Sequence, residues 1–82
     1  MRIQITQHHI NRGLRGSTTK DPVALAMLDA GFKNPWASPS HLWVEFEDRG
    51  LRVETPESVL QFMKSFDNEN FVEPFEFELE VQ

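Results

Sequence analysis

The sequence predicts an α+β fold, and its hydrophobic pattern carries this prediction. Apolar and polar residues alternate, as they do in half-buried strands, in four stretches: 2–6, 41–47, 51–54 and 75–81. Two further stretches combine a capped start with apolar residues at helical spacing: 21–30 and 55–66. This order predicts a β-α-β-β-α-β fold, a four-stranded, mainly antiparallel sheet with two helices on one face. Ferredoxin-like domains have this split topology.

Length and composition limit the classes of protein to consider. The 82 residues allow a single compact domain spanning 1–82. The chain is 39% hydrophobic and 26% charged, which is typical of globular rather than disordered proteins. The absence of cysteine excludes zinc fingers, iron–sulfur clusters and thiol nucleophiles. No stretch approaches the roughly 20 apolar residues of a membrane span and no signal peptide is visible, so we expect a cytoplasmic protein.

The first element is a strand at 2–6 whose isoleucines face inward. Thr6 can cap a short helical turn through residues 8–10, and Gly13 can end that turn. Residues 13–20 are rich in Gly, Ser and Thr, and this composition predicts a loop.

The first long helix is predicted to begin at Asp21-Pro22, since Asp21 can accept from an unpaired backbone N–H and Pro22 needs no N–H there. Leu28 is expected among its core residues, and Gly31 suits the left-handed conformation that ends a helix. Residues 33–40 contain two prolines and are predicted to be an irregular connection.

The middle strands are predicted to form a hairpin. Within 41–47, Val44 faces the core and Trp43 faces solvent. We expect the turn at residues 48–50, with Gly50 at positive φ. Thr55-Pro56 is predicted to cap the second helix as Asp21-Pro22 caps the first.

Charge divides the chain into two unlike parts. The formal net charge of -5 consists of +3 on residues 1–35, from five cations and two carboxylates, and -8 on residues 36–82, from three cations and eleven carboxylates. Asymmetry of this kind bears on partners and association rates rather than on fold.

Three glutamates occupy alternate positions of the last predicted strand: Glu76, Glu78 and Glu80. Their carboxylates would lie on one sheet face about 6.5–7 Å apart, near the phosphate spacing of a DNA strand. Glu45 and Glu47 are expected on the same outer face. The pattern predicts either a surface that imitates nucleic-acid charge for a basic partner, or edge strands whose charges prevent aggregation.

In the second interpretation we expect Arg2 and Arg52 to pair with glutamates across the sheet. Trp43 would stand beside those glutamates, and exposed tryptophans often anchor protein interfaces. Trp36, in the proline-flanked connection, is expected to cover the edge of the core.

Five cations in the first part of the chain offer an alternative, nucleic-acid-binding surface: Arg2, Arg12, Arg15, Lys20 and Lys33. Glycines between them favour a loop that holds phosphates, but no established phosphate-loop pattern is matched.

His8, His9 and His41 have no spacing typical of a metal site, so we expect surface or capping roles and no metal or cofactor. No nucleophile, base and acid can be assembled from the sequence, so an enzyme is not predicted.

Three segments together resemble a family of small phage, prophage and bacterial proteins without an assigned activity: 5–13 (ITQHHINRG), 21–26 (DPVALA) and 75–79 (FEFEL). The family pairs an I-T-x-x-H-I-x-x-G start with a C-P-V-A-L-A helix and an F-x-F-x-L strand. Asp21 stands where the family tends to have the second of two cysteines, and Thr18 stands near the first. Any metal or redox role of those cysteines would therefore be absent here. The resemblance implies a phage-like context in a bacterial host cell.

Three functional hypotheses follow. The first is a non-enzymatic protein, such as a phage-type inhibitor, whose acidic face binds a basic surface of a host protein or nucleic-acid-processing complex. The predicted contact residues are Trp43, Glu45, Glu47, Glu76, Glu78 and Glu80. The others are a small nucleic-acid-binding module and a structural homo-oligomer that pairs through an edge strand.

Overall fold

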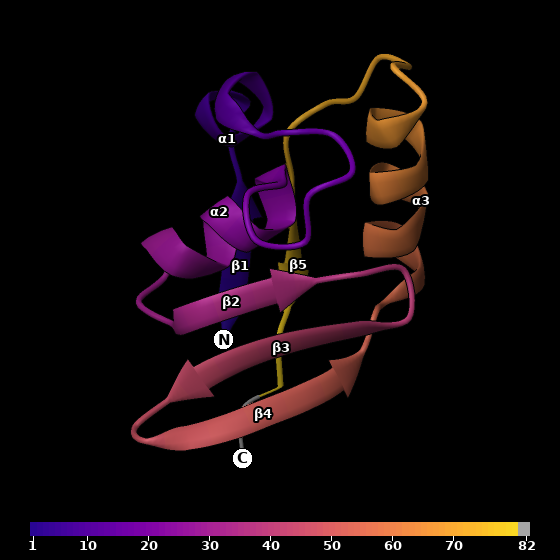
Figure 1. The fold of residues 1–82 in the computed structure, drawn as a ribbon. Helices are drawn as coiled ribbons and strands as arrows, with labels where there is room; N and C mark the ends of the chain where they lie inside the picture. The colour runs from indigo at the N-terminus through magenta and orange to yellow at the C-terminus, as the bar shows by residue number, and fades with distance from the viewer. Residues whose placement is uncertain (81–82) are drawn as a thin grey trace.

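The computed structural model describes residues 1–80, and within them five strands form two antiparallel sheets. β1 (Arg2–Ile5) pairs with β5 (Phe75–Glu78), and a three-stranded sheet contains β2 (Lys33–Ala37), β3 (His41–Phe46) and β4 (Arg49–Glu54). In Figure 1 the three-stranded sheet lies in front of β1 and β5, and its strands run across them. The predicted α+β class is confirmed, whereas the single four-stranded sheet with two helices is wrong.

Within residues 1–80, three helices surround these sheets. α1 (Gln7–Arg12) and α2 (Pro22–Asp29) lie beside β1, and α3 (Glu57–Asp67) stands at the opposite side of the molecule (Figure 1). The predicted caps of the first two helices are confirmed: Thr6 accepts a hydrogen bond from the backbone N–H of His9. Asp21 accepts one from Ala24 at 2.7 Å.

α3 begins without a side-chain cap, so the prediction for Thr55 is wrong. Pro56 occupies the N-cap position. The hydroxyl of Thr55 instead donates to the carbonyl of Ser38 at 2.7 Å, because the chain enters α3 directly beside the β2–β3 turn. Thr55 therefore stabilises the β2–β3 turn rather than the start of α3.

β2 is a strand where an irregular connection was predicted. Among the described residues it is an edge strand that pairs with β3 alone, and the pairing is irregular between Lys33 and Trp36. Asn34 has φ 49° within this irregularity. Pro35 is tolerated here because an edge strand with a bulge needs no ladder hydrogen bond from every residue.

The core lies between the two sheets and the helices. Ile3, Met27, Leu42 and Val59, from β1, α2, β3 and α3, are each at most 1% exposed. Leu28, predicted in the core, is 52% exposed, because Met27 occupies the buried side of α2 and the next residue turns about 100° away.

The last strand follows its predicted alternation within the described residues. Phe77 and Leu79 are buried, and the glutamates between them are exposed. The ring of Phe75 lies 5.1 Å from that of Phe62, which ties α3 to β5. β5 ends at Glu78, so the prediction that Leu79 and Glu80 belong to the strand is wrong, and the predicted position of Val81 lies outside the described residues.

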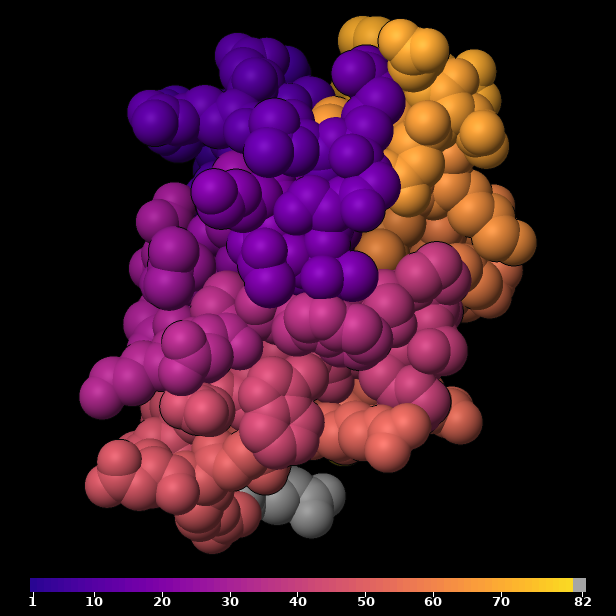
Figure 2. Space-filling view, in the orientation of Figure 1, coloured from indigo at the N-terminus to yellow at the C-terminus, as the bar shows by residue number. Residues whose placement is uncertain are grey.

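The predicted loop at 13–20 is fastened to the end of α3. Arg15 donates to the carbonyl of Phe66 at 3.1 Å and covers its ring, and the N–H of Gly16 donates to Asp67 at 3.2 Å. Figure 2 shows the N-terminal segment and the orange residues of the α3 region meeting along the top of the molecule.

Candidate functional site

The outer face of the three-stranded sheet carries two tryptophans on neighbouring strands. Trp36 on β2 is the cross-strand partner of Trp43 on β3, and Trp43 is the partner of Arg52 on β4. Trp36 is 39% exposed and Trp43 is 37% exposed, while Val44, the next residue, is buried. We call Trp36, Trp43, Arg52 and their neighbour His41 the tryptophan face.

The expectation that Trp36 covers the edge of the core from a loop is wrong. Along β2, Pro35 and Ala37 are buried and Trp36 between them is exposed, which is the alternation of a half-buried strand. This alternation is present in the sequence, but the two prolines of the segment hide it. Trp36 is therefore the residue of this face that sequence reasoning placed incorrectly.

Gly50 is required by Trp43 rather than by the turn. A Cβ atom at Gly50 would lie 2.1 Å from Cη2 of Trp43, so the indole lies across a strand position that has no side chain. The hairpin turn is instead formed by Glu47 and Asp48, which have φ 50° and 63°. Both angles are left-handed, as in a two-residue type I′ turn, and the prediction of positive φ at Gly50 is wrong.

Two hollows flank the paired indoles. One, of about 400 Å³, is lined by Trp36 and Trp43 together with Ser40, His41 and Arg52. The other, of about 420 Å³, shares both tryptophans and continues toward α2. Its further lining is Thr19, Leu28, Asn34 and Pro35. The indoles thus form a wall common to two adjacent depressions.

His41 and Arg52 form the polar end of the tryptophan face, and hydrogen bonds in the β2–β3 turn position His41. The N–H of His41 donates to the hydroxyl of Ser38, and that hydroxyl lies 3.1 Å from the carbonyl of His41. Nη2 of Arg52 lies 3.3 Å from Nδ1 and 3.2 Å from Nε2 of His41, so the guanidinium covers the imidazole edge. Among residues 1–80, no carboxylate lies within ion-pair distance of Arg52.

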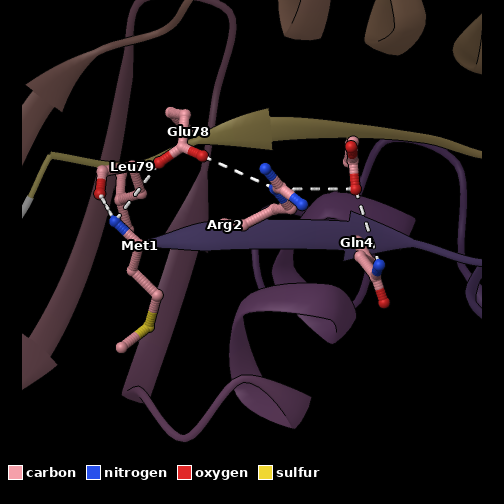
Figure 3. Close-up of polar contacts among 6 residues, drawn as sticks. Met1, Arg2, Gln4, Glu78 and Leu79 are labelled. Atoms are coloured by element: carbon pink, nitrogen blue, oxygen red, sulfur yellow. Dashed lines mark hydrogen bonds and ion pairs between the residues drawn. The ribbon is translucent and has the colours of Figure 1, made fainter.

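The acidic strand, Glu76, Glu78 and Glu80, is partly neutralised within the molecule. Nε of Arg2 lies 3.8 Å from Glu76 and 3.6 Å from Glu78. Figure 3 shows the side chain of Arg2 beside that of Glu78, with a dashed line for this ion pair. The N-terminal ammonium of Met1 lies 3.5 Å from Glu78 and donates to the carbonyl of Leu79. The predicted pairing of Arg2 with glutamates across the sheet is confirmed, whereas Arg52 contacts His41 instead.

The two predicted groups of glutamates do not share one sheet face. Glu45 belongs to β3 and accepts from Asn34 at 2.9 Å. Glu47 lies in the hairpin turn. Glu76 and Glu78 belong to β5, which is part of the other sheet. The prediction of a common face was wrong because it assumed that all the strands belong to a single sheet.

A smaller hollow of about 280 Å³ lies where β4 approaches the end of β5. Three of its lining residues are glutamates: Glu54, Glu78 and Glu80. Glu54 and Glu80 have no ion pair among the described residues. The negative charge that remains available on this side is therefore centred on the hollow rather than on the whole acidic strand.

The five cations of the nucleic-acid alternative are not assembled into a patch. Arg2 is paired with glutamates and Arg15 covers the ring of Phe66. Lys33 is the cross-strand partner of Glu45. Arg12 and Lys20 are exposed on α1 and on the following loop. The contacts within residues 1–80 join none of them to another.

His9 links α1 to α2. Its Nδ1 accepts from the backbone N–H of Thr6 at 3.0 Å, and its Nε2 lies 2.6 Å from Oδ2 of Asp29. The hydroxyl of Thr6 is 3.1 Å from the same Nδ1, beside a hollow of about 480 Å³ that Arg2 and His8 also line. A hydroxyl, imidazole and carboxylate are thus in contact, but the backbone N–H occupies the lone pair that a general base needs. The arrangement is a capping box.

Asp21 is the one group of residues 1–80 whose pKa is clearly displaced. The pKa of Asp21 is raised from 3.8 to about 7, mainly because burial disfavours the charged carboxylate. Backbone hydrogen bonds from Ala24 and Val23 oppose this rise, and the nearby Asp67 contributes to it. Asp21 is 4% exposed at the start of α2. Its role is therefore to cap that helix.

Residues 1–80 contain no group of three or more His, Asp or Glu residues placed to hold a metal ion. None of the described helices is long and apolar enough to span a membrane. A scan against family models and searches of curated proteins and of solved structures found nothing that matches this chain. The resemblance to the phage and bacterial family remains a prediction.

Proposed function

We propose that the protein is a non-enzymatic binding protein and that its tryptophan face docks on a partner protein. The observation that carries this proposal is the exposed cross-strand row of Trp36, Trp43 and Arg52. Tryptophan and arginine dominate the binding energy of protein interfaces because they combine a large contact area with hydrogen-bond donors. The adjacent hollows give a partner's side chains places to insert.

A selection from a random displayed-peptide library tests the proposal and does not require the partner to be identified first. Clones enriched on the wild-type protein should bind the Trp36→Ala and Trp43→Ala variants at least about tenfold more weakly, the loss typical of an interface anchor. Phe71, which is 85% exposed outside this face, provides a matched control, since Phe71→Ala removes an apolar surface side chain elsewhere. Circular dichroism should show that all three variants are folded.

Enriched clones that bind wild type and Phe71→Ala equally but fail on both tryptophan variants support the proposal. Failure to enrich any clone, or clones that bind all four proteins equally, overturns it.

The acidic hollow supports a second candidate, a phage-type inhibitor that binds a basic protein surface by imitating nucleic-acid charge. Glu54 and Glu80, which have no ion pair among residues 1–80, are the carboxylates to reverse. A lysine-rich peptide should bind wild type at low salt, and Glu54→Lys with Glu80→Lys should abolish the binding. Unchanged binding would eliminate this candidate. Reversing Glu76 is a poorer test because it also removes a partner of Arg2.

A further inference from the structure

We infer that the partner segment on the tryptophan face is an extended proline-rich stretch in the polyproline II conformation, with an acidic residue that contacts Arg52. The inference rests on the proposed function and names the chemistry of the partner. It depends on three features of the face: the two hollows, the unused hydrogen-bond donors and the uncompensated guanidinium.

The shape of the face fits a helix with three residues per turn. The hollows of about 400 and 420 Å³ lie next to each other and share the walls formed by Trp36 and Trp43. In a polyproline II helix, residues three apart point in the same direction, so two prolines spaced in this way can enter adjacent hollows. Aromatic-lined grooves are the surfaces by which other domains recognise such segments.

The donors of the face match the free acceptors of such a segment. Polyproline II has no internal hydrogen bonds, so its carbonyls seek donors from a partner. Neither indole N–H of Trp36 or Trp43 has a hydrogen-bond partner among residues 1–80. A proline-rich ligand is thus complementary in hydrogen bonding as well as in shape.

Charge determines the remaining feature of the ligand. Arg52 lines one hollow and is without a carboxylate partner in the described part of the chain. Ion pairs at a partly desolvated interface improve specificity and the association rate. An acidic residue next to the prolines would compensate this cation, whereas a basic residue would be repelled.

Two other modes of recognition fit less well. Strand addition at the β2 edge is obstructed, since Asn34 interrupts the edge with φ 49° and the N–H of Ala37 already donates to the carbonyl of Thr18. Single-stranded nucleic acid would stack on the indoles but needs a positive groove. The same sheet carries Glu45 and Glu54 beside its cations.

Intrinsic fluorescence gives a direct test, because the chain has two tryptophans and no tyrosine and both tryptophans belong to this face. Three synthetic nonapeptides are compared: oligoproline with a central glutamate, the same with a central lysine, and the glutamate peptide with alternating Gly and Ser in place of proline. The glutamate oligoproline should produce a saturable change in emission. The lysine peptide should bind at least about tenfold more weakly, and the Gly/Ser peptide should not bind.

The variants are measured by anisotropy of a labelled glutamate oligoproline, so that loss of a tryptophan does not remove the readout. Trp43→Ala should abolish binding, Phe71→Ala should leave it unchanged, and Arg52→Gln should remove the preference for glutamate over lysine. Retention of that preference in Arg52→Gln overturns the assignment of Arg52.

Absence of saturable binding by the glutamate oligoproline, or equal binding of the Gly/Ser peptide, overturns the inference. The proposed function survives this result if the displayed-peptide selection yields tryptophan-dependent clones without prolines. Two further results also overturn the inference: saturable binding of oligothymidylate in place of the peptides, and a dimer that light scattering shows to dissociate in Trp43→Ala.

Discussion

The outer surfaces of the two sheets differ in whether their charged and aromatic side chains have partners within the chain. On the β1–β5 sheet, Arg2 lies within 3.8 Å of both Glu76 and Glu78, so opposite charges compensate within the chain. On the three-stranded sheet, Arg52 has no carboxylate partner among residues 1–80, and two indoles stay exposed. A regular charge pattern is therefore weak evidence for binding when the compensating charges lie on the neighbouring strand.

The largest expected effect concerns a carboxylate that belongs to neither surface. Asp21 is buried with a pKa of about 7 against 3.8 for an exposed side chain, so between these pH values the folded state holds a proton that the unfolded state has lost. Its contribution to the unfolding free energy should therefore fall by at most about 4 kcal/mol as the pH rises from about 4 to about 7. Above about pH 7 this contribution should stay constant.

Asp21→Asn isolates this contribution, because the amide keeps a capping oxygen and carries no charge. Urea unfolding at pH 4 and pH 8 should show similar stability for the two proteins at the lower pH and a more stable variant at the higher. A difference independent of pH would show that Asp21 is not protonated in the folded protein, and that an uncompensated buried charge is tolerated inside the fold.

The next effect tests how the tryptophan face is built. Gly50→Ala places a methyl group where the ring of Trp43 lies, so the indole must move and the unfolding free energy should fall by about 1 kcal/mol. In a Trp43→Ala background the same substitution should cost nothing. Thermal unfolding of the four proteins measures the coupling, and additive effects would contradict the contact between Gly50 and Trp43.

The smallest effect compares the two arginines directly. Arg2→Gln should lower the unfolding free energy by under about 1 kcal/mol at low salt and by less at high salt, since its exposed ion pairs are screened. Arg52→Gln should change stability by no more than about 0.5 kcal/mol. If urea unfolding showed Arg52 to be the more stabilising of the two, the distinction between an internally paired surface and a binding surface would fail.

Local features of this molecule were predictable from the sequence because local interactions determine them. Thr6 and Asp21 cap helices through hydrogen bonds to residues three positions away. Gly31 has φ 102° at the end of α2, as its position predicts. The alternation of Phe and Glu in the last strand also appears in the structure.

Features that depend on distant partners were not predictable. The role of Gly50 depends on the ring of Trp43 across the hairpin, and β2 depends on β3 accepting a strand that contains Pro35. The local pattern does not indicate that the strands divide into two sheets. The prediction that Glu45 and Glu76 share one face was therefore wrong. For the candidate site, Trp43 was identified because alternation is local, and Trp36 was not because its prolines conceal the strand.

The pairing of β1 with β5 has a consequence for how the chain folds. Ile3 is the partner of Phe77, so almost the whole sequence separates two neighbouring residues of one sheet. The β2–β3–β4 hairpins join residues that are close in sequence, and such contacts form with a small loss of loop entropy. The surface that carries the tryptophans is therefore expected to form before β1 pairs with β5. β1 pairs only once residues 75–78 are available to it.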